Sequence, residues 1–84
     1  MNLTNLTWIA DPSHAWLKVP LNQLGDRKYT NFSYRDEDFA YLEEDCDATL
    51  FLVSHKVTMQ DAEQIPEQYT DGSSEVRNYR RIND

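Results

Sequence analysis

The chain has 84 residues and a formal net charge of −7, with fifteen Asp and Glu against eight Lys and Arg. A chain of this length holds one hydrophobic core, so we expect a single domain spanning residues 1–84. The negative charge disfavours direct binding to DNA, RNA or an anionic membrane, and it favours a partner with a basic surface. Two Trp, five Tyr and three Phe argue against an intrinsically disordered chain, which lacks the apolar side chains that offset the entropy cost of folding.

The cysteine usage and the hydropathy pattern predict a cytoplasmic protein. The single cysteine, Cys46, cannot form an internal disulfide, and its spacing from His14 and His55 does not resemble a zinc site. The N-terminal residues have neither the basic region nor the apolar run of a signal peptide. No stretch approaches the roughly 20 apolar residues of a membrane span, so we expect no membrane association.

Two β-hairpins are predicted in the first half of the chain. Residues 6–10 have strand composition, and residues 15–19 alternate apolar and polar side chains after a turn that contains Pro. A second alternating pair, residues 32–35 and 39–42, flanks the acidic triplet Asp36-Glu37-Asp38. We therefore expect a second hairpin with an acidic tip.

The apolar run Ala48 to Val57 is the candidate for the main helix. Periodicity alone does not separate a helix from a buried strand here, and Leu50-Phe51-Leu52-Val53 has reasonable strand propensity. The flanks favour a helix, because Asp45 or Asp47 is a good N-cap and the acids before the run suit the helix dipole. We expect a helix.

The C-terminal third is predicted to hold a short helix and a last strand or hairpin. Thr58 is a good cap for a helical segment that continues to Gln64. The turn Asp71-Gly72-Ser73-Ser74 separates residues 67–70 from residues 76–79, and a frayed tail, residues 80–84, would follow. Together these elements predict an α+β fold, a small single domain in which an antiparallel sheet built from hairpins carries one main helix.

The segment AYLEEDCD, Ala40 to Asp47, precedes the apolar run, and the segments 11–20, 32–34, 50–52 and 70–79 accompany it. In these segments, which span most of the chain, the sequence resembles a family of small uncharacterised proteins from bacteria, phages and plasmids. AYLEEDCD is the most specific piece of the resemblance. The resemblance implies an origin and a rough fold, since the family has no established activity.

An acidic segment, residues 36–47, concentrates seven carboxylates without a basic residue. Like charges so close together repel one another, and they raise the pKa of some members. The segment is either a hairpin tip with helix caps or a surface that mimics nucleic acid phosphates and docks on a basic groove. It lacks the spacing and the central Gly of an EF-hand, so we expect no metal. The predicted partner-binding residues are Asp36, Glu37, Asp38, Tyr41, Glu43, Glu44 and Asp47.

Two further groups are weaker candidates for a catalytic site. Asp11 could orient His14 as a general base beside Trp16, but an Asp followed by Pro and His is also ordinary turn chemistry. Cys46 lies between two aspartates and has no placed base, which favours a buried or half-buried structural thiol over a nucleophile. We therefore do not expect an enzyme.

The basic residues near the C-terminus form the one basic patch of the sequence. Arg77, Arg80 and Arg81 surround Tyr79, a pattern that single-stranded nucleic acid binders use. Ion pairs with the acidic segment, or a solvated tail, are the favoured reading. A third reading joins the arginines to Ser73-Ser74 as an anion pocket. The two glycines give no nucleotide-binding pattern, so no cofactor is expected.

These observations predict a small acidic interaction protein, encoded by a phage or mobile element. It would bind a host nucleic-acid-processing or defence protein with a basic surface and inhibit it, as anti-restriction and anti-CRISPR proteins do. Glu43 and Glu44, beside Tyr41, are its best functional carboxylates. The alternative is a small-molecule or nucleotide-binding module of unknown role, and a homodimer is expected from the small core.

Overall fold

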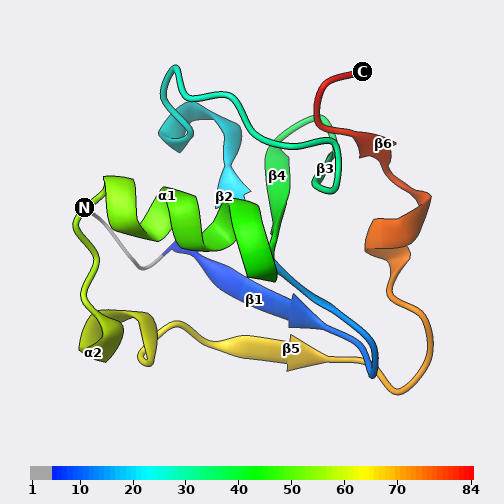
Figure 1. Cartoon of the computed structure of the whole chain (residues 1–84). Helices are drawn as coiled ribbons and strands as arrows, with labels where there is room; N and C mark the ends of the chain where they lie inside the picture. Colours follow the sequence, from blue (N-terminus) through cyan, green and yellow to red (C-terminus); the bar gives the residue numbers. More distant parts are fainter. Residues whose placement is uncertain (1–4) are drawn as a thin grey trace.

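The computed structural model describes residues 5–84, which form a six-stranded sheet with one main helix packed on it (Figure 1). The strand order is β5-β1-β2-β4-β3-β6, and every neighbouring pair is antiparallel except β1 and β5, which are parallel. The strands are β1 (Thr7–Ala10), β2 (Ala15–Pro20), β3 (Tyr34–Arg35), β4 (Phe39–Glu43), β5 (Glu67–Tyr69) and β6 (Arg80–Arg81). The α+β fold class expected from the sequence is confirmed.

The helical elements are short. They are the 3-10 turns η2 (Leu21–Gln23) and η4 (Glu75–Asn78), the π-helical turn η3 (Glu44–Ala48), and the α-helices α1 (Thr49–Ser54) and α2 (Met59–Ala62). η3 continues directly into α1, so residues 44–54 form the one main helix, and α2 begins at the predicted Thr58 cap. The helical reading of the apolar run is therefore confirmed.

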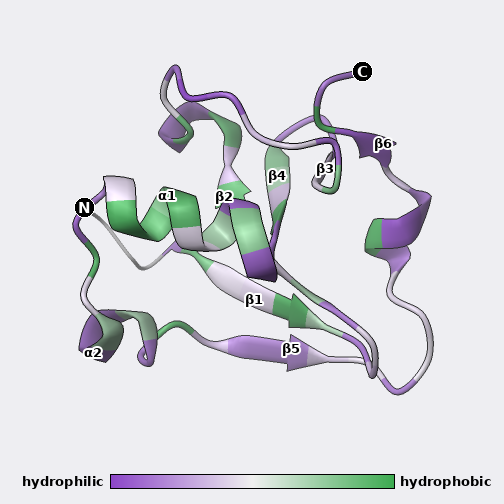
Figure 2. Cartoon of the chain, in the orientation of Figure 1, coloured by the Kyte–Doolittle hydropathy of each residue, from purple (hydrophilic) through white to green (hydrophobic). Residues whose placement is uncertain are grey.

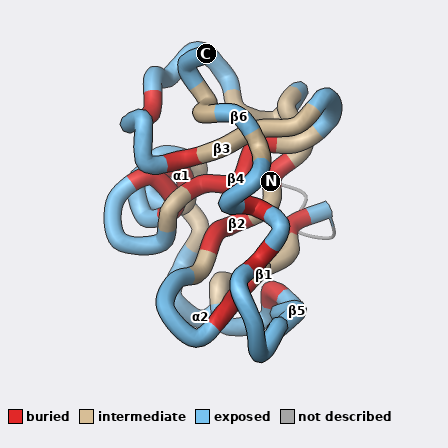
Figure 3. The backbone as a smooth tube through the Cα atoms, turned by 90° about the vertical axis from the view of Figure 1, so that its right-hand side faces the viewer, coloured by how far each residue is buried: buried red, intermediate tan, exposed pale blue. Residues whose placement is uncertain are grey.

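The alternation in the central strands assigns each side chain to one face of the sheet. In β2, Leu17 and Val19 are buried beneath α1, while Trp16 lies on the opposite face. Phe51 of α1 is fully buried on the first face. The rest of this α1-side core includes Leu6, Tyr29, Ala40, Leu42, Ala48 and Ile65. Buried residues follow β2 and β4 through the centre of the molecule (Figure 3).

The opposite face carries a second, aromatic cluster. Trp16, Tyr41 and Val76 are buried in it, and Ile9, Tyr34, Phe39 and Tyr79 pack around them. The two edge strands are hydrophilic, in contrast to the apolar face of α1 (Figure 2). An edge strand presents unpaired backbone groups to other chains, and polar side chains along the edge limit pairing there.

The last strand predicted at residues 67–70 is confirmed as β5, but the alternative, a last hairpin with residues 76–79, is wrong. Residues 75–78 form η4 and not a strand, because Ser74 caps this turn by accepting a hydrogen bond from the Val76 amide. β5 and β6 lie at opposite edges of the sheet, so the chain between them crosses the sheet instead of turning back on itself. The predicted frayed tail is also wrong, since β6 pairs with β3 and the Ile82 amide donates to the Ser33 carbonyl.

The start of the main helix also differs from the prediction. Its N-cap is Glu43, whose carboxylate accepts a hydrogen bond from the Asp45 amide, and not Asp45 or Asp47. Asp47 is fully buried inside the first turns. Glu43 ends β4, and from there its side chain reaches the Asp45 amide. The Asp45 side chain is exposed.

Candidate interaction groove

A groove of about 540 Å³ opens on the face of the sheet opposite α1. Strands β2, β3, β4 and β6 supply it together with η3, η4 and the turn after β1. We name it the aromatic groove, and it is lined by His14, Trp16, Phe32, Tyr34, Glu43, Asp45, Cys46, Arg77 and Arg81. Its walls are aromatic, and side chains of both charges reach into it.

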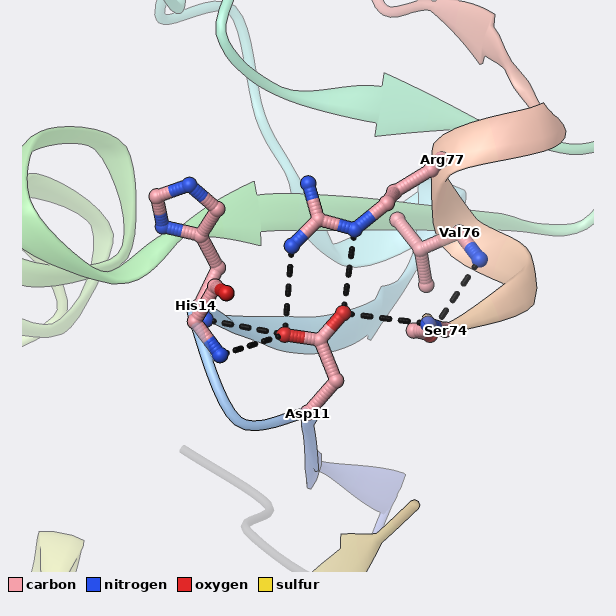
Figure 4. Close-up of polar contacts among 6 residues, drawn as sticks. Asp11, His14, Ser74, Val76 and Arg77 are labelled. Atoms are coloured by element: carbon pink, nitrogen blue, oxygen red, sulfur yellow. Dashed lines mark hydrogen bonds and ion pairs between the residues drawn. The ribbon is translucent and has the colours of Figure 1, made fainter. Parts of the chain in front are cut away.

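One side of the groove is fixed by Asp11 (Figure 4). The Asp11 carboxylate accepts backbone hydrogen bonds from Ser13 at 3.0 Å, His14 at 2.9 Å and Ser74 at 3.0 Å. It also accepts a bidentate pair from Arg77, with Nε at 3.0 Å and Nη2 at 3.2 Å. The Asp11 side chain is almost completely buried. It therefore ties the first hairpin turn to η4 across the sheet.

The Asp11 carboxylate remains charged when buried. The hydrogen bonds from the Arg77 guanidinium, followed by that from the Ser74 amide, hold its pKa well below the ordinary aspartate value. The paired guanidinium lies over Trp16, with the Arg77 Cζ 5.2 Å from the ring centroid. Arg77 therefore lines the groove with its charge neutralised by Asp11.

Cations lie over two of the aromatic rings that line the groove. Besides Arg77 over Trp16, Arg81 lies 4.4 Å above Tyr34. Phe32 is 65% exposed, and no cation of the described residues lies over its ring. The groove thus holds one open aromatic surface.

The carboxylates of the groove carry no ion pair. Among residues 5–84, the one ion pair within 4.0 Å joins Arg77 to Asp11. Glu43 is half-buried, and its carboxylate accepts a hydrogen bond from the Asp45 amide at the helix cap. Burial, followed by repulsion from Asp45 and Glu43, raises the pKa of the neighbouring Glu44. Glu44 and Asp45 are both exposed.

The hairpin tip divides into an internal and an exposed part. Asp36 accepts hydrogen bonds from Tyr41 Oη at 2.6 Å and from the amides of Asp38 and Phe39. Burial opposes these bonds, but together they lower the pKa of Asp36. Burial and the Asp36 contact raise the pKa of Tyr41. Glu37 and Asp38 are exposed, so they are the two members of the tip that a partner can reach.

Asp47 has an internal role. Its carboxylate accepts hydrogen bonds from the Thr30 amide and hydroxyl and from the Ser33 hydroxyl. These bonds tie the loop before β3 to the main helix. Its side chain is fully buried and unavailable to a partner, as is most of Tyr41.

Two other sequence expectations meet different outcomes. The prediction of a buried or half-buried thiol is wrong, because Cys46 is exposed. It lies in η3 and lines the groove. Asp11 bonds the backbone amide of His14, which matches the turn reading. The His14 ring instead lies edge-on to Trp16, with centroids 6.0 Å apart.

The arginine patch is dispersed, and it does not pair with the acidic segment. Arg77 pairs with Asp11, while Arg80 and Arg81 extend from the edge strand β6. Sequence reasoning did not assign Phe32, Tyr34 and Arg81 to one groove. The alternation of Phe32 and Tyr34 signals a shared face, but it does not reveal that β6 pairs beside them.

Within residues 5–84, four large hydrophobic side chains are exposed away from the groove. Leu50 and Val53 project from α1, Met59 begins α2, and Tyr69 ends β5. None of them lines the aromatic groove. The homodimer expected from the sequence stays a prediction.

Within residues 5–84, no group of three or more His, Cys, Asp and Glu is placed to hold a metal ion. In the same part of the chain, no helix has the length and apolarity to cross a membrane. No protein-family model, curated protein or solved structure matches the chain. The resemblance to small bacterial, phage and plasmid proteins stays a prediction from the sequence.

Proposed function

We propose that the protein is a small acidic interaction protein that binds a protein with a basic surface. The contact surface is the aromatic groove together with the exposed carboxylates at its edge, Glu44 and Asp45. One observation carries the proposal: exposed carboxylates without an ion pair adjoin an open aromatic groove.

The chemistry of the groove is that of a protein contact surface. Tyr, Trp and Arg are enriched among the residues that dominate binding energy at interfaces. The groove supplies Trp16, Tyr34, Arg77 and Arg81, and Asp11 holds one of these arginines in place. A surface ordered before binding loses less side-chain entropy on association, which favours affinity.

The net charge of −7 supports a cationic partner. Complementary charge speeds encounter with a basic surface and discriminates against acidic ones. A host enzyme that processes nucleic acid, or a defence protein, carries such a surface where it binds phosphates. Occupation of that surface by this acidic protein would inhibit the enzyme, which is the role proposed from the sequence.

A small-molecule module is the second candidate, favoured by the size of the groove. Ligand pockets commonly span about 300–1,000 Å³, with apolar walls and a few polar groups. A thermal-shift screen separates the two candidates, because a ligand at 100 times its dissociation constant stabilises a fold by about 2.7 kcal/mol.

Two charge-matched double variants test the primary proposal. Glu44→Gln with Asp45→Asn removes two exposed charges beside the groove, and Glu37→Gln with Asp38→Asn removes two from the hairpin tip. The probe is a peptide of eight arginines, with its affinity measured by calorimetry at 50 mM and 300 mM salt.

We expect the Glu44/Asp45 variant to weaken binding about ten-fold at low salt, since two nearby charges interact with a cationic partner by about 1.4 kcal/mol in total. The tip variant should weaken binding less, and high salt should reduce the difference. Equal losses in both variants would show that net charge alone binds the peptide, and they would contradict a specific surface.

A further inference from the structure

We infer that the aromatic groove seats an arginine side chain of the partner, stacked on Phe32 and paired with Asp45 and Glu43. This inference rests on the proposed function and specifies the chemistry that the groove recognises. It follows from three features of the groove: its open ring, its unpaired carboxylates and its charge balance.

The open ring is Phe32. On this face the molecule places a cation over an aromatic ring three times, with Lys18 over Phe39, Arg77 over Trp16 and Arg81 over Tyr34. Among residues 5–84 no cation lies over Phe32, which is 65% exposed and lines the same groove. A cation above an aromatic face is attracted by the ring quadrupole. The other three rings bind a cation of the chain itself, so the Phe32 ring is open to a cation of a partner.

The unpaired carboxylates are those of Asp45 and Glu43. Both line the groove with Phe32, and neither forms an ion pair within residues 5–84. Glu43 caps the helix through one amide, and a carboxylate has about four acceptor positions, so it retains capacity for a further donor. Asp45 is exposed, so its carboxylate is open to a donor from a partner.

The charge balance of the groove favours a cation. Asp11 neutralises Arg77, so Arg81 is the one arginine of the groove without a carboxylate partner, against the two carboxylates Glu43 and Asp45. Arg81 remains stacked on Tyr34, where its N–H groups can donate to backbone carbonyls of a bound peptide.

Arginine suits the groove better than lysine. Its planar guanidinium stacks on a ring and donates in a fork to carboxylates at the same time. The compact ammonium of lysine is a strongly hydrated point charge, and it does not combine both contacts equally well. The groove should therefore discriminate between two side chains of equal charge.

The test compares three nine-residue peptides of Gly and Ser that differ at the central position, which is arginine, lysine or the neutral isostere citrulline. Affinities are measured by NMR titration of the ¹⁵N-labelled chain. We expect the arginine peptide to bind about three-fold more tightly than the lysine peptide, since lysine does not keep the ring contact and the carboxylate contact together and a cation–π contact at an exposed site contributes about 0.5–1 kcal/mol. The uncharged citrulline peptide should bind weakest.

Two pairs of variants locate the contact. Phe32→Ala should weaken arginine binding about three-fold, whereas Tyr69→Ala, which removes a ring of 57% exposure from β5, should leave it unchanged. Asp45→Asn should weaken binding more than Asp38→Asn, which removes the same charge from the hairpin tip.

Each negative result has a separate meaning. Equal affinity for arginine and lysine, with no effect of Phe32→Ala, overturns the arginine site even if the octa-arginine peptide still binds through the Glu44/Asp45 edge. If neither the octa-arginine peptide nor the single-arginine peptide binds, the proposed function fails together with the site.

Discussion

The two faces of the sheet have opposite chemistry although they share the strands β2 and β4. The α1 side buries Leu17, Val19 and Phe51 in an apolar core. The other side is aromatic and charged, and it carries Trp16 and Tyr41 under an open groove. The α1-side core therefore contributes stability without taking part in recognition, whereas the Asp11 connection beside the groove contributes to both.

The largest effect should follow from Phe51→Ala, which attacks the apolar face. Phe51 is fully buried, and truncation of such a side chain costs about 3–5 kcal/mol through lost burial and a new cavity. Small domains have roughly 5–15 kcal/mol of stability, so a large share would be lost. Urea unfolding measures this change; a loss below about 1 kcal/mol would contradict the assignment of Phe51 to the core.

Asp11→Asn should break the connection between the hairpin turn and η4. The amide cannot carry the charge that Arg77 pairs with, so the variant should unfold at lower urea concentration than the wild type at pH 7. It should also weaken peptide binding, because Arg77 is no longer fixed over Trp16.

The pH dependence of the same variant supplies the check. The folded-state pKa of Asp11 lies below its unfolded value, so its contribution is complete above about pH 4 and is lost as pH falls through the folded-state pKa. The stability difference between wild type and Asp11→Asn should therefore narrow as pH falls below about 4. A constant difference from pH 7 to pH 2 would indicate that the charge of Asp11 is irrelevant.

The smallest effect should come from Lys56→Gly, which touches neither face. Lys56 follows α1 with a positive φ of 59°, and the amides of Lys56 and Val57 donate to the carbonyls of Val53 and Leu52. Glycine adopts this left-handed conformation without strain, so the variant should gain about 0.5–1 kcal/mol. Thermal unfolding measures the gain, and peptide affinity should stay at the wild-type value.

Local patterns in the sequence predicted the hairpins and the main helix. The period of two in residues 15–19 and 39–42 assigned the strands β2 and β4, and Thr58 marked the start of α2. The last hairpin failed because Val76 and Tyr79 have strand-like composition, whereas a long-range contact of Ser74 with Asp11 determines where η4 forms. That contact joins residues 63 positions apart, which no local pattern encodes.

The candidate site was only partly predictable for the same reason. The acidic segment was visible as charge, but its members separate into buried Asp47, internally bonded Asp36 and exposed Glu44 and Asp45. Phe32 joins them in a groove through the order of strands, which depends on the pairing of β6 with β3.

The most direct measurement of the division between the faces is an NMR map of the ¹⁵N-labelled chain with the single-arginine peptide. We expect the amide signals of Phe32, Glu43, Asp45 and Cys46 to move during the titration, while those of Leu17, Val19 and Phe51 stay in place. Changes confined to the hairpin tip at Glu37 and Asp38, or on α1, would contradict the aromatic groove as the binding surface.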